Sequence, residues 1–311
     1  MKNIIKSIFI ITLSFATVFA QNKSSYKKTK KTKTTKSHRS KKGNKTKELI
    51  NILTTADDYS SYDLVALIQD PAINLNARDD YGDTILMRAL TLIKCVHTDK
   101  GKMDKQNKIQ LQNMILAAFD NPMLDVNMSN YSNTTLLMFI LSNELIFLSD
   151  RPSPKNCTYV SMDPQIRRTL FNALMKKNPD LNQMTRGEFH SGFSALTFVV
   201  DGMDLVMYDS IFYEGKKWEL AQNENSSGYP DVGIVKELLK RGALISGTDL
   251  MIAKINAEWA DRHANYEGDW TKKCMLYKTT HEVLRLLKTT VAKELQTRKF
   301  LNKKSNSKKQ K

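Results

Sequence analysis

The chain has 311 residues, enough for one large domain or two small ones, and its 48 Lys and Arg against 32 Asp and Glu give a formal net charge of +16. Residues 1–47 and 298–311 hold 21 of the basic residues and no acid. The other 27 basic residues face all 32 acids in 48–297, so that part carries a formal charge of −5, which excludes a domain that is basic throughout.

The first twenty residues have the pattern of an export signal. Lys2 and Lys6 precede an apolar stretch at 8–19, and Val18-Phe19-Ala20 offers small-residue positions for cleavage before Gln21. The alternative, an N-terminal membrane anchor, needs about twenty apolar residues, and Lys6 interrupts such a span. We therefore expect an exported protein, periplasmic or secreted, with no transmembrane segment in the mature chain.

Residues 21–47 alternate Lys with Ser and Thr and contain twelve Lys or Arg. Such a segment cannot bury enough apolar surface to offset its chain entropy, so we expect a disordered basic linker, and the tail at 298–311 has the same pattern. Two interpretations of these segments stay open. They either attach the protein to an anionic surface such as an envelope, a glycan or nucleic acid, or serve as solvated linkers.

Internal repetition is the main signal between the two basic ends. Residues 76–90 align without a gap on residues 127–141, which pairs Asn76 with Asn127, Gly82 with Asn133 and Thr84 with Thr135. Gly and Asn tolerate positive φ best, so both copies can form the same tight turn. Thr then stands where a helix cap is needed.

The repeat resembles the ankyrin repeat. The first part of that pattern is matched by Asn76, Ala77, Asp79, Gly82, Thr84, Leu86 and Ala89. Residues 234–243, IVKELLKRGA, match the second part, and weaker copies begin at Asn182 and Ser246. The usual Pro and His are replaced by Ile85 and Met87. The resemblance implies an all-α fold, an ankyrin-type helical solenoid over 48–297 with short hairpin tips.

About five helix pairs are expected, and the loops between the two helices of a pair are enlarged. The pairs are 48–55 with 63–69, 84–94 with 108–118, 135–145 with 164–176, 194–206 with 233–240, and 249–260 with 278–299. The insertions are 96–107, 147–163, 207–232 and 261–277. They either gather into a second binding surface or reflect neutral loop growth, and the sequence does not decide between these.

Motifs for catalysis and metal binding are missing from the sequence. The five histidines are scattered without an HExxH pattern, and no GxSxG or phosphate-binding glycine loop is found. Cys95, Cys157 and Cys274 show no CxxC spacing and allow at most one intrachain disulfide. We therefore expect a protein that is not an enzyme and needs no cofactor or metal.

The resemblance implies a non-enzymatic scaffold that binds a protein partner on a concave surface made of hairpin tips and first helices. Positions that the repeat leaves free for a partner are Arg78, Asp80, Tyr81, Asp83, Arg88, Ser129, Tyr131, Ser132, Thr134, Phe139, Phe189 and His190. Tyr81 and Tyr131 are either anchors for the partner or pack between adjacent hairpins. Two other functions stay open. The basic tails can attach the protein to an anionic surface with the solenoid as a spacer, or the insertions can form an enzyme site.

Overall fold

A computed structural model describes residues 42–56, 58–97, 101–142, 157–159, 162–186, 191–201, 230–263 and 270–309. All of them belong to one compact unit, Ser40–Lys311. The expected export signal and the basic segment up to residue 41 lie outside the described residues. So do Phe189, His190 and most of the expected insertion at 207–232.

The described residues are mostly helical, with ten α-helices, as the expected all-α class requires. The helices are α2 (Lys42–Thr55), α3 (Leu64–Gln69), α4 (Ile85–Ile93), α5 (Gly101–Phe119), α6 (Leu136–Leu141), α7 (Pro164–Met175), α8 (Ala195–Asp201), α10 (Val232–Lys240), α11 (Gly247–His263) and α12 (Trp270–Lys309).

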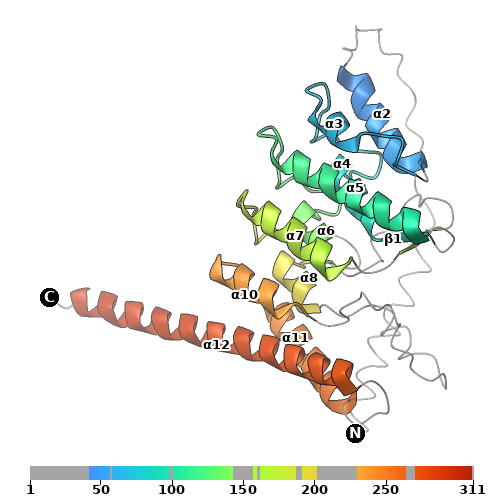
Figure 1. Ribbon diagram of the computed structural model, residues 1–311. Coiled ribbons are helices and arrows are strands. Elements are labelled where there is room, and N and C mark those ends of the chain that lie inside the picture. The colour runs from blue at the N-terminus through green and yellow to red at the C-terminus, as the bar shows by residue number, and fades with distance from the viewer. Residues whose placement is uncertain are drawn as a thin grey trace, which may run out of the picture. The chain divides into compact units, whose positions relative to one another are not determined.

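These helices form two rows (Figure 1). In the first row, α2 contacts α4, α4 contacts α6, α6 contacts α8, and α8 contacts α11. In the second row α3 contacts α5 and α5 contacts α7, and α10 contacts α12. Also in the second row, Arg168 on α7 forms an ion pair of 2.6 Å with Asp231, the residue that precedes α10. Each helix of the first row from α4 onward also packs against the next helix in the chain, so the fold is a stack of helix pairs.

The two rows begin their helices with different caps. In the first row, Thr84 and Thr135 cap α4 and α6 through their hydroxyl groups, and the sulfur atoms of Met87 and Met138 accept the Thr backbone N–H groups at 3.5 and 3.4 Å. In a capping box the third residue of the helix accepts the backbone N–H of the capping residue. Here the thioether of methionine, a weak acceptor, takes that role. The capping role expected for the two threonines is therefore confirmed.

In the second row, aspartate takes the capping position. Asp63, Asp163 and Asp231 accept backbone N–H groups at the start of α3, α7 and α10. A carboxylate at a helix N-terminus satisfies free N–H groups and interacts favourably with the helix dipole. These three aspartates therefore mark the starts of α3, α7 and α10 in the sequence.

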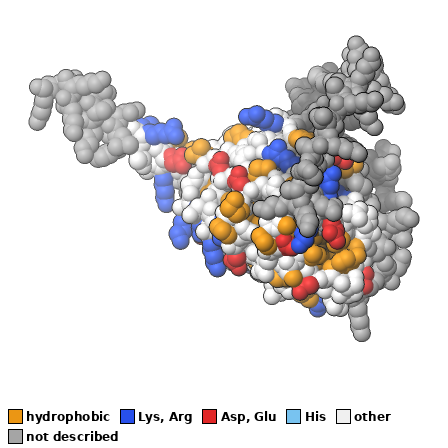
Figure 2. All heavy atoms as spheres, turned by 90° about the horizontal axis from the view of Figure 1, so that it is seen from above, with side chains coloured by type: hydrophobic (Ala, Val, Ile, Leu, Met, Phe, Trp, Pro, Cys, Tyr) orange, Lys and Arg blue, Asp and Glu red, His pale blue; other side chains and the backbone are white. Residues whose placement is uncertain are grey.

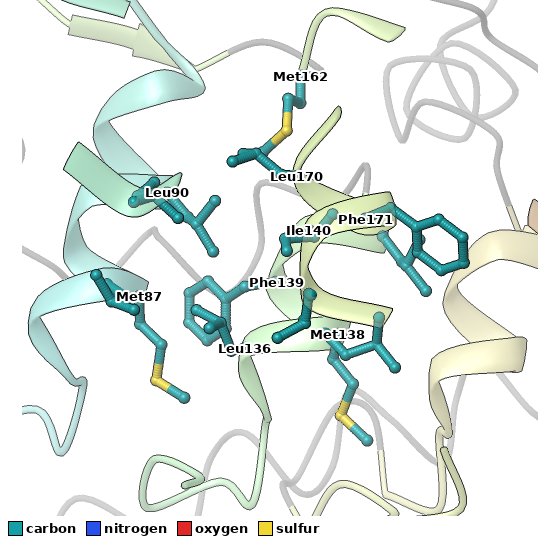
Figure 3. Close-up of a cluster of buried hydrophobic side chains, with 14 of the residues drawn as sticks. Met87, Leu90, Leu136, Met138, Phe139, Ile140, Met162, Leu170 and Phe171 are labelled. Carbon is teal, nitrogen blue, oxygen red and sulfur yellow. The ribbon is translucent and has the colours of Figure 1, made fainter. Parts of the chain in front are cut away.

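The core lies between the rows and continues from one helix pair to the next. Every residue of α4 and α6 is buried. Figure 3 shows Met87 and Leu90 of α4 close to Phe139 of α6, with Phe171 of α7 on the far side of α6. Because neither helix of a pair buries its apolar face alone, the packing of one pair on the next supplies the core.

Two of the expected insertions meet in a short antiparallel ladder. The strands are β1 (Cys95–His97) and β2 (Cys157–Tyr159), and they pair in the register Cys95 to Tyr159 and His97 to Cys157. This addition to the all-α expectation joins the second helix pair to the third. Residues 101–107 belong to α5, so the first insertion is shorter than expected.

Both ends of the stack extend beyond the boundaries expected from composition. The disordered linker was expected to reach residue 47, but α2 begins at Lys42, and the buried Thr46 accepts the backbone N–H of Asn74 at 2.9 Å. The tail was expected to be disordered from 298, but α12 continues to Lys309. Adding one residue to an existing helix costs far less than starting one, so a basic tail with good helix formers can continue it.

An ion pair between Lys45 of α2 and Asp70 makes the stability of the protein depend on pH. Lys45 forms an ion pair of 2.5 Å with Asp70, whose other oxygen accepts the N–H of Ala72. The hydrogen bond from Lys45 is the main cause that lowers the pKa of Asp70 in the folded protein. A lowered folded-state pKa stabilises the protein above the carboxyl's ordinary pKa of about 3.9, and this stabilisation is lost as the pH falls through the folded-state value.

We therefore expect Asp70→Asn to unfold at a lower temperature than the parent at pH 7, and the difference to shrink as the pH falls below about 3.9. Thermal unfolding of both proteins between neutral and acid pH measures this. Glu48, an exposed acid on α2, provides the control as Glu48→Gln. A difference for Asp70→Asn that stays constant down to the lowest pH would contradict the role of the charge.

Candidate binding edge formed by the hairpins

The first hairpin is closed by Asp79, a residue of the repeat pattern. Its backbone N–H bonds to the carbonyl of Asp83 at 2.9 Å, and its carbonyl accepts the N–H of Gly82 at 3.0 Å. Its side chain accepts the N–H groups of Tyr81 and Asp83. Gly82 has a φ of 81°, a region that glycine enters without strain. The tip therefore presents Asp80 and Tyr81 outward on a fixed turn.

The second hairpin repeats this geometry with Asn130 in place of Asp79. The backbone N–H of Asn130 donates to the carbonyl of Thr134 at 3.1 Å, and its side chain accepts the N–H groups of Ser132 and Thr134. Asn133 has a φ of 58°. The prediction that Gly82 and Asn133 form the same turn with positive φ is confirmed.

The third hairpin is longer than the first two, since its paired residues Thr185 and Phe193 lie eight residues apart. Thr185 and Phe193 pair through the N–H of Thr185 and the carbonyl of Phe193 at 2.9 Å, and Gly192 has a φ of 83°. The N–H of Arg186 donates to the carbonyl of Ser132 at 2.7 Å. The third tip thus joins the second through the main chain.

The first two tips are joined by a side chain and an aromatic ring. The Asn130 amide donates to the carboxylate of Asp83 at 3.0 Å. A Cβ atom placed on Gly82 would lie only 2.7 Å from Cγ of Tyr131, so the ring rests on the glycine. Tyr131 therefore packs between adjacent hairpins, as one of the two interpretations proposed, although 69% of it is exposed.

A further set of contacts holds each helix pair to the next, through Asn76, Asn127 and Asn182. The side chain of Asn76 donates to the carbonyl of Met123 at 2.8 Å and accepts the N–H of Asp125 at 3.0 Å. Asn182 contacts Gly242 and Leu244 in the same way, and Asn127 accepts the N–H of Asp180. The alignment found these residues but not their role, since their partners lie about fifty residues further along the chain.

The exposed side chains of the first two hairpins form what we call the hairpin edge. Arg78, Asp80 and Tyr81 are exposed, with 42% of Tyr81 accessible, and Tyr131 is exposed while Ser129 and Ser132 are partly so. Within the described residues, the side chains of Arg78, Asp80 and Tyr81 form no hydrogen bond. They are free to contact a partner without loss of a contact that the fold requires.

Four of the expected contact residues are buried, so their placement on an exposed surface is wrong. The exposed fractions are 1% for Asp83, 3% for Arg88, 1% for Thr134 and 4% for Phe139. Asp83 is covered because it accepts the bond from the next hairpin. Arg88 and Phe139 lie at the same position of α4 and α6, helices that are buried over their whole length.

Charge on the hairpin edge is mixed, because Arg78 lies beside Asp80 in the first tip. On the face drawn in Figure 2, acidic and basic side chains are likewise interspersed with apolar ones. An edge of mixed charge does not favour a polyanion, whose binding needs an excess of Lys and Arg.

Comparisons with family models, curated proteins and solved structures give no match. Within the described ranges, no group of three or more His, Cys, Asp or Glu is arranged to hold a metal ion. In the same part of the chain, no helix combines the length and the apolar character needed to span a membrane.

Proposed function

We propose that this chain is an exported protein of the ankyrin-repeat kind, which binds a protein partner through its hairpin edge and carries out no reaction itself. Paired helices stacked in two rows, hairpins closed by Asp79 and Asn130, and capping threonines at Thr84 and Thr135 support the assignment to that architecture. The export step rests on the sequence of residues 1–20.

One observation carries the binding role. Consecutive hairpins are bonded to each other, and yet Arg78, Asp80 and Tyr81 remain exposed on the first of them. A rigid edge loses little conformational entropy when a partner binds, and tyrosine and arginine are the residues that most often dominate protein interfaces. Burial of Arg88 and Phe139 moves the proposed contact surface away from the first helices and onto the tips.

Capture of a partner by the mature chain tests this function. The tip variant Asp80→Ala, Tyr81→Ala should retain the parent's unfolding temperature, because both side chains are exposed, and should lose most of the captured partner. A central tyrosine in an interface is worth about 2 kcal/mol or more, which corresponds to a roughly thirtyfold loss of affinity.

The matched control is Ile109→Ala on α5, another exposed apolar residue, of which 46% is accessible. This variant should bind like the parent. If the tip variant binds as tightly as the parent, or if residues 21–41 alone capture the same partner, the hairpin edge is not the binding surface.

A further inference from the structure

The repeat shows which face of a first-row helix is covered by its neighbours. Ser194 starts α8 as Thr84 and Thr135 start α4 and α6, because its hydroxyl accepts the N–H of Thr197. The fifth residue after each cap is Ala89 in α4, Ile140 in α6 and Val199 in α8, and all three are at most 2% exposed. Each of these helices contacts the next helix of the row. This position therefore belongs to the surface that is buried inside the stack.

The same position in the last helix of the row is exposed. Ser246 caps α11 through paired hydrogen bonds with Asp249, and the fifth residue after it, Met251, is 56% exposed. Ile255, one turn further, is 44% exposed, whereas the corresponding Ile93 of α4 is buried. Met251 and Ile255 form an apolar stripe, here called the α11 stripe, that the half-buried Trp259 continues.

The opposite end of the stack is polar. Among residues 45–55 of α2, the exposed positions are Lys45, Lys47, Glu48, Asn51 and Thr55. A second copy joined head to tail would set the α11 stripe against these polar and charged groups, whose desolvation opposes binding. The stripe instead fits a surface of its own kind.

We propose that two copies of this chain associate through the α11 stripe, with the two α11 helices antiparallel about a twofold axis near Ile255. In that arrangement Ile255 meets its counterpart, and Met251 meets the region of Trp259. Lys254 and Glu258 lie beside the stripe, one turn apart, with their charged atoms 3.5 Å from each other. The twofold axis brings Lys254 of each copy near Glu258 of the other, so the charges beside the stripe are complementary.

This surface is separate from the hairpin edge, so it goes beyond the proposed function and can be tested without a partner. A single helix pair buries less area than a standard stable interface, and the dimer should therefore be reversible and depend on protein concentration. Sedimentation velocity of the mature chain over roughly a hundredfold range of concentration should show a shift from monomer to dimer.

The variant Ile255→Lys places two like charges at the twofold axis and should weaken the dimer at least about tenfold. Ile109→Lys, an equally exposed change on α5, should leave the dimer unchanged. Both variants should unfold near the parent's temperature, because the altered side chains are exposed. A monomer at every concentration, or equal dissociation constants for Ile255→Lys and the parent, would overturn the proposal.

Charge reversal tests whether Lys254 and Glu258 contact the other copy. Lys254→Glu alone sets four acids at the interface and Glu258→Lys alone sets four lysines there, so each variant should be more monomeric than the parent. A mixture of the two restores both opposite-charge contacts and should form a heterodimer. If the mixture stays as monomeric as its components, the proposed pairing of Lys254 with Glu258 is wrong.

Discussion

Asp249→Ala is expected to destabilise the protein by about 3 kcal/mol, a magnitude typical of breaking a buried, hydrogen-bonded charge. Asp249 is fully buried. One of its oxygens accepts the hydroxyl of Thr197 at 2.6 Å, and the other accepts the N–H and the hydroxyl of Ser246. Alanine would leave these donors without their acceptor. Because Thr197 belongs to α8 and Asp249 to α11, the last helix pair should be the first to separate.

Chemical unfolding and hydrogen exchange test this prediction together. Denaturant unfolding gives the loss of stability, and exchange should be fastest in α11 and α12. The control is Glu282→Ala, which removes an exposed ion pair of 2.6 Å with Lys236 and should change stability by less than about 1 kcal/mol. Equal effects of the two substitutions would show that Asp249 does not hold α11 to α8.

The features that the sequence predicted are those fixed by local chemistry. A turn with positive φ needs Gly or Asn, and a helix start needs a small polar cap, so Gly82, Asn133, Thr84 and Thr135 could be assigned from residue type and spacing alone. These turns and caps are decided within a few residues of chain, whereas the helix pairs were expected from the resemblance to the ankyrin repeat.

Features that depend on the next repeat could not be predicted in this way. Arg88 and Phe139 stand at positions that the repeat pattern leaves free, and only the packing of neighbouring helices buries them. Asn76 reaches partners 47 and 49 residues away. Composition also set the basic linker to end at residue 47, although Thr46 is already buried. A lysine-rich segment can form a helix where a few of its residues pack against the core.

Gly82→Val is expected to cost about 3 kcal/mol, because two separate effects oppose a side chain at this position. A β-branched residue is strained at a φ of 81°, at a cost of about 1 to 3 kcal/mol. In addition, the new Cβ would displace the Tyr131 ring, whose packing contributes on the order of 1 kcal/mol. Gly82→Asn should reduce the backbone strain, since Asn133 adopts a positive φ at the equivalent position of the next hairpin. It should still displace the Tyr131 ring.

Gly192 separates the two effects, because it has nearly the same φ, 83°, and, apart from its chain neighbours, no atom of the described residues lies within 4 Å of the place where a Cβ would lie. Gly192→Ala should therefore cost only the backbone strain, about 1 kcal/mol, and Gly82→Ala about 2 kcal/mol. In a Tyr131→Ala background the cost of Gly82→Ala should fall to that of Gly192→Ala, since no ring remains to be displaced. Denaturant unfolding of the four proteins in this double-mutant cycle measures the coupling. If Gly82→Ala costs the same with and without the tyrosine, Tyr131 does not join the first two hairpins and is free to act with Tyr81 as an anchor for the partner.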